Sequence, residues 1–182
     1  FDHAMHATMR RAAALGESPN RITLLRDADG DGVAEQRHAF MEKLNQPFGM
    51  ALVGETFYAG HTDGVLAYPY VPGATSITAP GTRLARFKPG GHWTRSLLAS
   101  RDGQRLYVGV GSLSNIGEHG MAAEEGRACI YELDLRTGQC RSAKPWLKPA
   151  RVTSTSLSCA PASIAVSPAT TASGAPSAGG SR

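Results

Sequence analysis

Short apolar runs recur along the chain, and most are separated by turns that contain Gly or Asp. Because Gly accepts the positive φ that tight hairpin turns require, this spacing predicts antiparallel strands joined by short connections. No segment after residue 20 shows the apolar period of a long helix. The pattern therefore predicts an all-β fold, with a β-sandwich or a β-propeller as the two candidate architectures.

The clearest hairpin is predicted at residues 96–110. Its strands are residues 96–99 and 106–110, and an Asp-Gly pair turns the chain between them. His92 precedes the first strand, and residues 111–115 follow the second. Since antiparallel strands bring these two positions to one end of a sheet, we expect His92 and the 111–115 loop to share a site.

Further strands are predicted by the same reasoning. Pro69, Pro72 and Pro80 interrupt the chain that follows residues 65–68, so residues 71–87 are predicted as loop with one short strand near residues 76–78. Loosely similar blocks, FYAGHTDG and YVGVGS, recur about 50 residues apart, a spacing that favours a propeller over a sandwich. The other predicted strands are residues 21–25, 50–53, 56–59, 65–68 and 128–133.

Charge and composition exclude some classes of function. The net charge is +4 with His neutral, but Lys and Arg are scattered, whereas nucleic-acid-binding proteins gather them on one face. We therefore expect no nucleic-acid partner. No apolar run approaches the roughly 18 residues of a membrane span. The chain begins with Phe1 rather than Met, as expected of a fragment or a processed form.

The three cysteines, Cys129, Cys140 and Cys159, lack the spacing of a zinc site. Cys129 and Cys140 flank a predicted hairpin, so they could pair in an oxidising compartment. Buried free thiols are the favoured alternative.

An acidic loop follows the first predicted strand in the sequence DADGDGVAE. Asp27, Asp29 and Asp31 alternate with small residues, and Glu35 follows. Alternating carboxylates in a tight loop suit a hard cation such as Ca²⁺. The spacing departs from an EF-hand, because His38 stands where a bidentate Glu belongs. A calcium site and a plain acidic hairpin turn both remain open at this point.

The composition divides the chain into three parts. Residues 1–19 form a poorly defined N-terminal segment, and residues 20–148 carry the predicted β-structure. Residues 149–182 are mostly Ala, Ser, Thr, Pro and Gly, so they are predicted to be a disordered low-complexity tail. The abrupt change leaves open whether this tail is natural sequence or the result of a frame change.

Several blocks of the chain resemble one known enzyme family. NRITLLRDADGDGVAE, LNQPFGMALVGETFYAGHTDGVLAYPY, FKPGGHWTRSLLASRDGQRLYVGVGSLSN and EEGRACIYELDL are similar, in order and spacing, to the glucose/sorbosone dehydrogenase family. That family consists of six-bladed β-propellers that oxidise sugars with pyrroloquinoline quinone (PQQ). The resemblance covers roughly residues 20–138 and implies about two to three blades of such a propeller.

The resemblance implies roles for individual residues. His92 stands at the family's general base, which removes a hydroxyl proton while hydride passes to PQQ. Gln46, in LNQPFG, stands at a PQQ-contacting glutamine. Arg95, Ser112 and Asn115 are the other expected cofactor-binding residues.

The chain also departs from the family pattern. Gly91 and Ser112 stand where the glucose-oxidising branch has aspartates, which is closer to the sorbosone-like branch. Residues 146–149 are at best a remnant of a later Arg-Asn-Pro-type loop. Six blades of about 40–50 residues need roughly 240–300 residues. The chain as given is therefore predicted neither to close the ring nor to turn over sugar.

The expected substrate is an aldose or a sugar aldehyde, and the expected electron acceptor of the parent protein is a quinone pool or a cytochrome. By the same resemblance, the parent is expected in the periplasm or secreted. Two alternatives remain: a propeller that binds a partner without chemistry, and a lactonase-like hydrolase that uses Ca²⁺ to polarise an ester.

Overall fold

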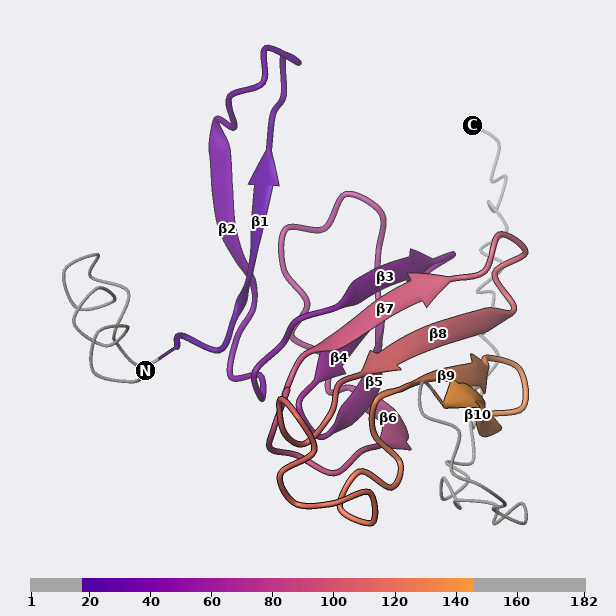
Figure 1. The fold of residues 1–182 in the computed structure, drawn as a ribbon. Helices are drawn as coiled ribbons and strands as arrows, with labels where there is room; N and C mark the ends of the chain where they lie inside the picture. The colour runs from indigo at the N-terminus through magenta and orange to yellow at the C-terminus, as the bar shows by residue number, and fades with distance from the viewer. Residues whose placement is uncertain (1–17, 146–182) are drawn as a thin grey trace, which may run out of the picture.

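A computed structural model describes residues 18–145, and Figure 1 shows their ten β-strands. The described residues contain no helix. The strands form a two-stranded hairpin and two four-stranded antiparallel sheets. The all-β prediction is confirmed. The segments expected to be an undefined N-terminus and a low-complexity tail, together with Cys159, lie almost wholly outside the described residues.

The first four-stranded sheet is a meander in which each strand pairs with the next along the chain, in the order β3-β4-β5-β6. Tight turns at Gly54-Glu55 and Thr62-Asp63 join the first three strands, as the sequence predicts. We call this sheet the first blade. Its strands are β3 (Met50–Val53), β4 (Thr56–His61), β5 (Gly64–Pro69) and β6 (Thr82–Arg86).

The second four-stranded sheet, the second blade, repeats this arrangement in the order β7-β8-β9-β10. Its first hairpin confirms the prediction at residues 96–110, with Arg95 opposite Val110 and Ala99 opposite Leu106. Strands β3 and β7 lie side by side where the two blades meet (Figure 1). The strands are β7 (Arg95–Ala99), β8 (Arg105–Val110), β9 (Cys129–Asp134) and β10 (Cys140–Pro145).

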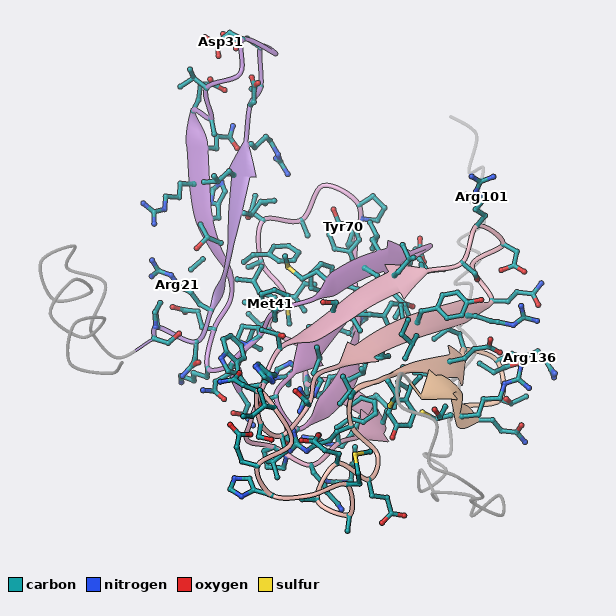
Figure 2. The ribbon with its side chains drawn as sticks, in the orientation of Figure 1. Arg21, Asp31, Met41, Tyr70, Arg101 and Arg136 are labelled. Carbon is teal, nitrogen blue, oxygen red and sulfur yellow. The ribbon has the colours of Figure 1, made fainter. Side chains whose placement is uncertain are left out.

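The remaining strands, β1 (Ile22–Arg26) and β2 (Gln36–Met41), form a hairpin that projects from the two blades (Figure 1). Figure 2 shows Asp31 at its outer tip and Met41 at its base. Phe40 and Met41 are buried there against the first blade, in a cluster with Ala59, Tyr68 and Ile77. The apolar contacts of the hairpin lie at its base, and Arg26, at the outer end of β1, also donates to the Gly73 carbonyl oxygen of the β5–β6 loop at 3.1 Å.

The main core lies between the facing sides of the two blades. Tyr58 and Val65 of the first blade pack with Leu106, Val108 and Leu133 of the second, and the last four of these are fully buried. Because side chains alternate across a strand, Tyr58 belongs to this core while its neighbour Ala59 belongs to the other cluster. Blades stacked face to face in this way are the arrangement of a β-propeller.

The seam between the blades depends on two glycines. The Gly49 N–H donates to the Arg95 carbonyl oxygen at 3.0 Å. A Cβ at Gly49 or at Gly60 would lie closer to that oxygen than van der Waals contact permits. The backbone of β7 can therefore approach the first blade only where these residues lack a side chain.

The sequence prediction is wrong at residues 76–78, and it contains no strand for β2, β6 or β10. Residues 76–78 form no strand; the strand of this region is β6, Thr82–Arg86, immediately after the third proline. Strand β2 was not predicted as such, because its sequence QRHAFM is mostly polar until Phe40 and Met41. Both strands are defined by their pairing partners rather than by their own apolar pattern.

Cys129 and Cys140 do not pair with each other. In the β9–β10 hairpin Cys140 lies opposite Leu133, whereas Cys129 lies opposite Pro145. Four residues of strand, at about 3.3 Å each, separate the two positions, which is beyond the reach of a disulfide. Burial raises the pKa of the Cys129 thiol and keeps it protonated.

Across residues 18–145, no helix has the length and apolar character needed to cross a membrane.

Candidate functional site

The loops that carry the candidate residues lie together at one end of the two blades. We call this end the rim; it comprises residues 42–49, 61–64, 87–94 and 111–128. The opposite end of the blades carries the turns that contain Arg101 and Arg136, which Figure 2 labels. The predicted neighbourhood of His92 and the 111–115 loop is confirmed, because the His92 N–H donates to the Ser112 carbonyl oxygen at 3.0 Å.

The His92 imidazole is exposed, and its contacts define which ring nitrogen carries the proton. Nδ1 lies 3.1 Å from the Ser112 carbonyl oxygen and 2.8 Å from Ser112 Oγ. The carbonyl oxygen can only accept, and the Ser112 hydroxyl donates its one proton to the Ser114 carbonyl oxygen at 2.7 Å. All three contacts are satisfied at once only when Nδ1 is the donor. In the neutral ring this leaves the lone pair on Nε2, the arrangement a general base needs.

An open groove of about 440 Å³ adjoins this imidazole. His92 and Asn115 both line it, so the structure brings these two predicted site residues together. Glu118 and His119, which the sequence analysis did not single out, line it as well. The remaining lining residues are Gly91, Leu113 and Ser114.

Arg95 was predicted to bind the cofactor, but its guanidinium is fully buried. It donates to the carbonyl oxygens of Lys88 at 3.0 Å, His92 at 2.9 Å and Thr94 at 3.0 Å. Burial, and then the nearby Arg127, lower the pKa of Arg95. In this chain Arg95 therefore holds the loop that carries His92, and its donors do not reach the groove.

Two buried residues of the rim, Glu124 and Arg127, were missed by the sequence analysis. The Glu124 carboxylate accepts the backbone N–H groups of Leu113 at 2.7 Å and Ser114 at 3.2 Å. The Arg127 guanidinium donates to the carbonyl oxygens of residues 88, 89 and 90. The sequence EEGR directly before an apolar strand could have pointed to these two residues. Charged side chains next to a core strand need buried partners to offset the cost of losing water.

Gln46 lies on the rim but does not line the groove. Its φ is +48°, and its N–H donates to Asn20 Oδ1 at 3.2 Å. Two residues further on, Phe48 meets Trp93 edge to face with ring centroids 6.0 Å apart. Through this aromatic pair the loop of Gln46 lies against the loop of His92, and half of the Phe48 side chain remains exposed.

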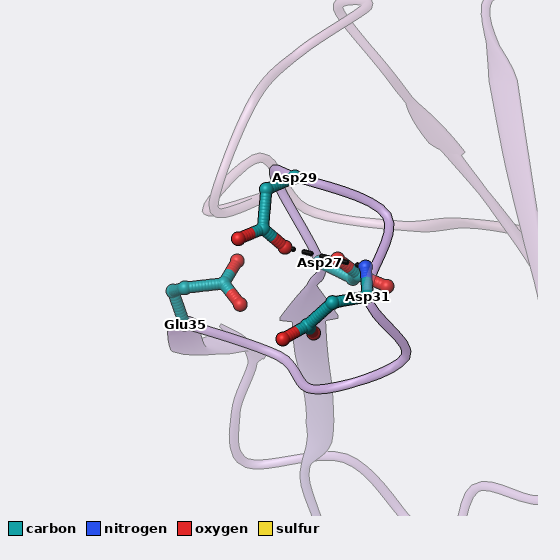
Figure 3. Close-up of side chains that lie close together, drawn as sticks. All are labelled: Asp27, Asp29, Asp31 and Glu35. Carbon is teal, nitrogen blue, oxygen red and sulfur yellow. Dashed lines mark hydrogen bonds between the residues drawn. The ribbon is translucent and has the colours of Figure 1, made fainter.

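The acidic loop forms the tip of the β1–β2 hairpin, and Figure 3 shows its four carboxylates turned toward one another. One oxygen from each of Asp27, Asp29, Asp31 and Glu35 lies within 4.8 Å of the others, and all four residues are exposed. Both oxygens of Asp27 accept backbone N–H groups, from Gly30 at 2.7 Å and Gly32 at 2.8 Å. These bonds, Gly32 foremost, lower the pKa of Asp27 and keep it charged. The loop is far from the groove (Figure 1).

Comparison with known proteins places the chain in a family. A family model described as TrAA12-like matches residues 18–154. The fold is similar to the PQQ domain of pyranose dehydrogenase from Coprinopsis cinerea, in its holo form, with a TM-score of 0.53 and 20% identity. It is also similar to a calcium structure of the Trichoderma reesei carbohydrate-active enzyme of family AA12, with a TM-score of 0.52 and 23% identity.

These two likenesses cover 63% and 64% of this chain but only 28% and 30% of the solved structures. The chain thus spans less than a third of their length. At these identities the likeness establishes the fold, a part of a β-propeller-like domain, and not the activity. No curated protein sequence matches the chain.

Proposed function

The chain belongs to the TrAA12-like family, and from this membership we propose that it carries part of the active site of a PQQ-dependent sugar oxidoreductase. Two similar solved structures support the proposal by their names: one is the PQQ domain of a pyranose dehydrogenase and the other a carbohydrate-active enzyme. The finer assignment, an aldose or sugar aldehyde as in glucose/sorbosone dehydrogenases, rests on the sequence blocks around His92.

The main structural support for the proposal is the orientation of His92. Ser112 holds Nδ1 as a donor, so the unprotonated Nε2 is available at an exposed position beside the groove. A sugar hydroxyl that donates to Nε2 would give up its proton there, while the carbon that bears it loses hydride and becomes a carbonyl. PQQ, when bound, supplies the two-electron acceptor for that hydride.

Several rim residues offer what one wall of a PQQ site needs, although the Glu118 carboxylate lines the same groove and would repel the carboxylates of PQQ. PQQ is a flat, polyanionic quinone, so it requires hydrogen-bond donors and an apolar surface for its rings. The Asn115 amide and the His119 ring can donate from the groove, and the Gln46 amide from the neighbouring loop. Trp93 and Phe48 offer exposed ring surface next to His92. Ser112 contributes by orienting His92, and Arg95 by holding the His92 loop.

We further propose that the tip of the β1–β2 hairpin binds Ca²⁺ through Asp27, Asp29, Asp31 and Glu35. Four convergent carboxylates supply hard oxygen ligands at a spacing a single ion can bridge. The position of the loop, on a hairpin that projects away from the rim, gives this ion a structural role (Figure 1). It does not favour a calcium-dependent hydrolase, whose metal must contact the substrate.

The remaining expectations concern the parent protein. A small sugar as substrate, a quinone pool or a cytochrome as electron acceptor, and a periplasmic or secreted location belong to the same proposal. The described chain alone provides one wall of the site, so we expect it to bind PQQ without turning over sugar.

Titration of the purified chain with PQQ, followed by the absorbance of the quinone, tests the proposal. We expect a saturable spectral change that His92→Ala weakens by about tenfold, as the loss of one well-placed hydrogen-bonding group would. His38→Ala, which removes a histidine from β2 outside the groove, should leave the titration unchanged. An unperturbed quinone spectrum would instead favour a binding module without redox chemistry.

A further inference from the structure

The loop of His92 and the loop of Ser112 are held by one short turn, residues 124–127. The Arg127 N–H donates to the Glu124 carbonyl oxygen at 2.9 Å, which closes the turn. The hydroxyl of Tyr131 donates to the Gly126 carbonyl oxygen at 3.0 Å and ties the turn to β9. Glu124 and Arg127 are only 7% and 6% exposed, so both charges depend on protein partners.

One end of the turn holds the Ser112 loop. The Glu124 carboxylate accepts three bonds, from the N–H of Leu113 and from both the N–H and the hydroxyl of Ser114. Donation by the Leu113 N–H is the main reason that the pKa of Glu124 is lowered, so the group is charged at neutral pH. Since Ser112 Oγ donates to the Ser114 carbonyl oxygen, fixing Ser114 also fixes the hydroxyl that faces His92.

The other end holds the His92 loop. The Arg127 guanidinium donates to the carbonyl oxygens of Lys88 at 2.9 Å, Pro89 at 2.6 Å and Gly90 at 2.9 Å. Three carbonyls of one short segment thus converge on a planar fork of donors that Lys could not reproduce. Gly91, with φ at +60°, follows this segment and packs against the backbone of Leu113.

We propose that Glu124 and Arg127 act together as positioning residues, setting the distance between the His92 and Ser112 loops so that Nδ1 keeps its proton and Nε2 its lone pair. The inference rests on the proposed function of His92. A carboxylate and a guanidinium three residues apart each hold one of the two loops, so the shape of the turn defines how the loops face each other.

The test reads the protonated nitrogen of His92 directly, in the full chain and without PQQ. Long-range ¹H–¹⁵N spectra of the neutral ring report which of its two nitrogens carries the proton. In the unmodified chain we expect a proton on Nδ1. A proton on Nε2 would overturn the inference, whatever the variants show.

The variants then test the turn. In Glu124→Gln we expect the ratio of the two His92 tautomers to shift toward Nε2–H by about three- to tenfold, since a neutral amide cannot accept all three bonds. Arg127→Lys should shift it in the same direction. Glu125→Gln is the matched control: it removes the same charge from an exposed neighbour and should leave the ratio unchanged.

Glu124→Asp, which keeps the charge but shortens the side chain, is the milder variant should Glu124→Gln unfold the chain. Unchanged tautomer ratios in folded Glu124 and Arg127 variants would contradict the positioning role. Because no quinone is present, a chain that fails to bind PQQ but shows these shifts would refute the proposed function and leave the inference standing.

Discussion

At the scale of single residues, Arg95 connects the packing of the two blades with the geometry of the site. Its carbonyl oxygen accepts the N–H of Gly49 at the seam, while its side chain holds the carbonyls of the His92 loop. The approach of the blades and the position of His92 therefore depend on the same residue.

The close contact between the blades leaves no room for a side chain at Gly60. In Gly60→Ala the new Cβ would clash with the backbone carbonyl of Arg95, which cannot move without shifting β7. We expect the free energy of unfolding to fall by about 1–3 kcal/mol in urea denaturation. Gly109→Ala is the control, because its Cβ would meet only the Ser96 side chain, at ordinary distances of 3.6 and 4.0 Å. Equal stability of the two variants would show that the seam is not tightly packed.

The burial of His61 should make the stability of the folded chain depend on pH. The ring is 3% exposed, and its Nδ1 accepts the N–H of Asn45 at 3.1 Å. Burial is the main reason that its pKa is lowered in the folded state. The unfolded state therefore binds more protons below the ordinary pKa of about 6.5, and stability must fall as the pH drops through that value.

The measurement is urea denaturation at a series of pH values between about 8 and 5, with a maximal slope of about 1.4 kcal/mol per pH unit for one histidine. In His61→Gln, whose amide oxygen can still accept the Asn45 N–H, we expect a shallower fall. Parallel curves for the two proteins would mean that His61 is not the group responsible.

At the scale of elements, the sequence identified β3, β4, β5, β7 and β8, because the Gly- and Asp-containing turns that join β3 to β5 and β7 to β8 depend on local backbone chemistry. It placed β7 and β8, and with them the neighbourhood of His92 and Ser112. It missed β6, since three prolines in the preceding stretch suggested a loop whose one short strand lay near residues 76–78. The role of Arg127 could not be predicted, because its partners lie 37–39 residues away in the sequence. The partners of Glu124 and Arg95 are nearer, but they are backbone groups of irregular loops whose path no local pattern defines.

The β1–β2 hairpin is the element that tests the calcium proposal. Isothermal titration of the chain with Ca²⁺ should give one binding site, and Asp29→Asn should weaken it by at least about tenfold through the loss of a charged ligand. Glu55→Gln, a change to an exposed carboxylate in the β3–β4 turn, should not affect it. Binding of equal strength in both variants would place the ion elsewhere.

At the scale of the whole molecule, the adjacent strands β3 and β7 carry exposed apolar side chains. Met50 and Leu52 are 50% and 53% exposed, and Leu98 is 67% exposed. Since the chain spans less than a third of the similar solved structures, these side chains lie where further parts of a propeller would be expected to cover them.

For the chain alone these exposed side chains, which lie on the outer faces of the two blades, should cause self-association. We expect sedimentation velocity to show species larger than a monomer, and the double variant Leu52→Lys, Leu98→Lys to remove most of them. Val71→Lys changes an equally exposed apolar residue in the β5–β6 loop and should have little effect. A monomeric wild-type chain at every concentration would contradict this account.

The proposed function depends on PQQ binding at the rim, beside His92. Trp93 is one of two tryptophans, so Trp146→Phe leaves it as the sole indole reporter, one residue from His92. We expect PQQ to quench its emission along a saturating curve that weakens in the additional variant His92→Ala. Quenching that rises linearly with PQQ, as for free tryptophan, would show that the rim holds no quinone and would contradict the proposed function.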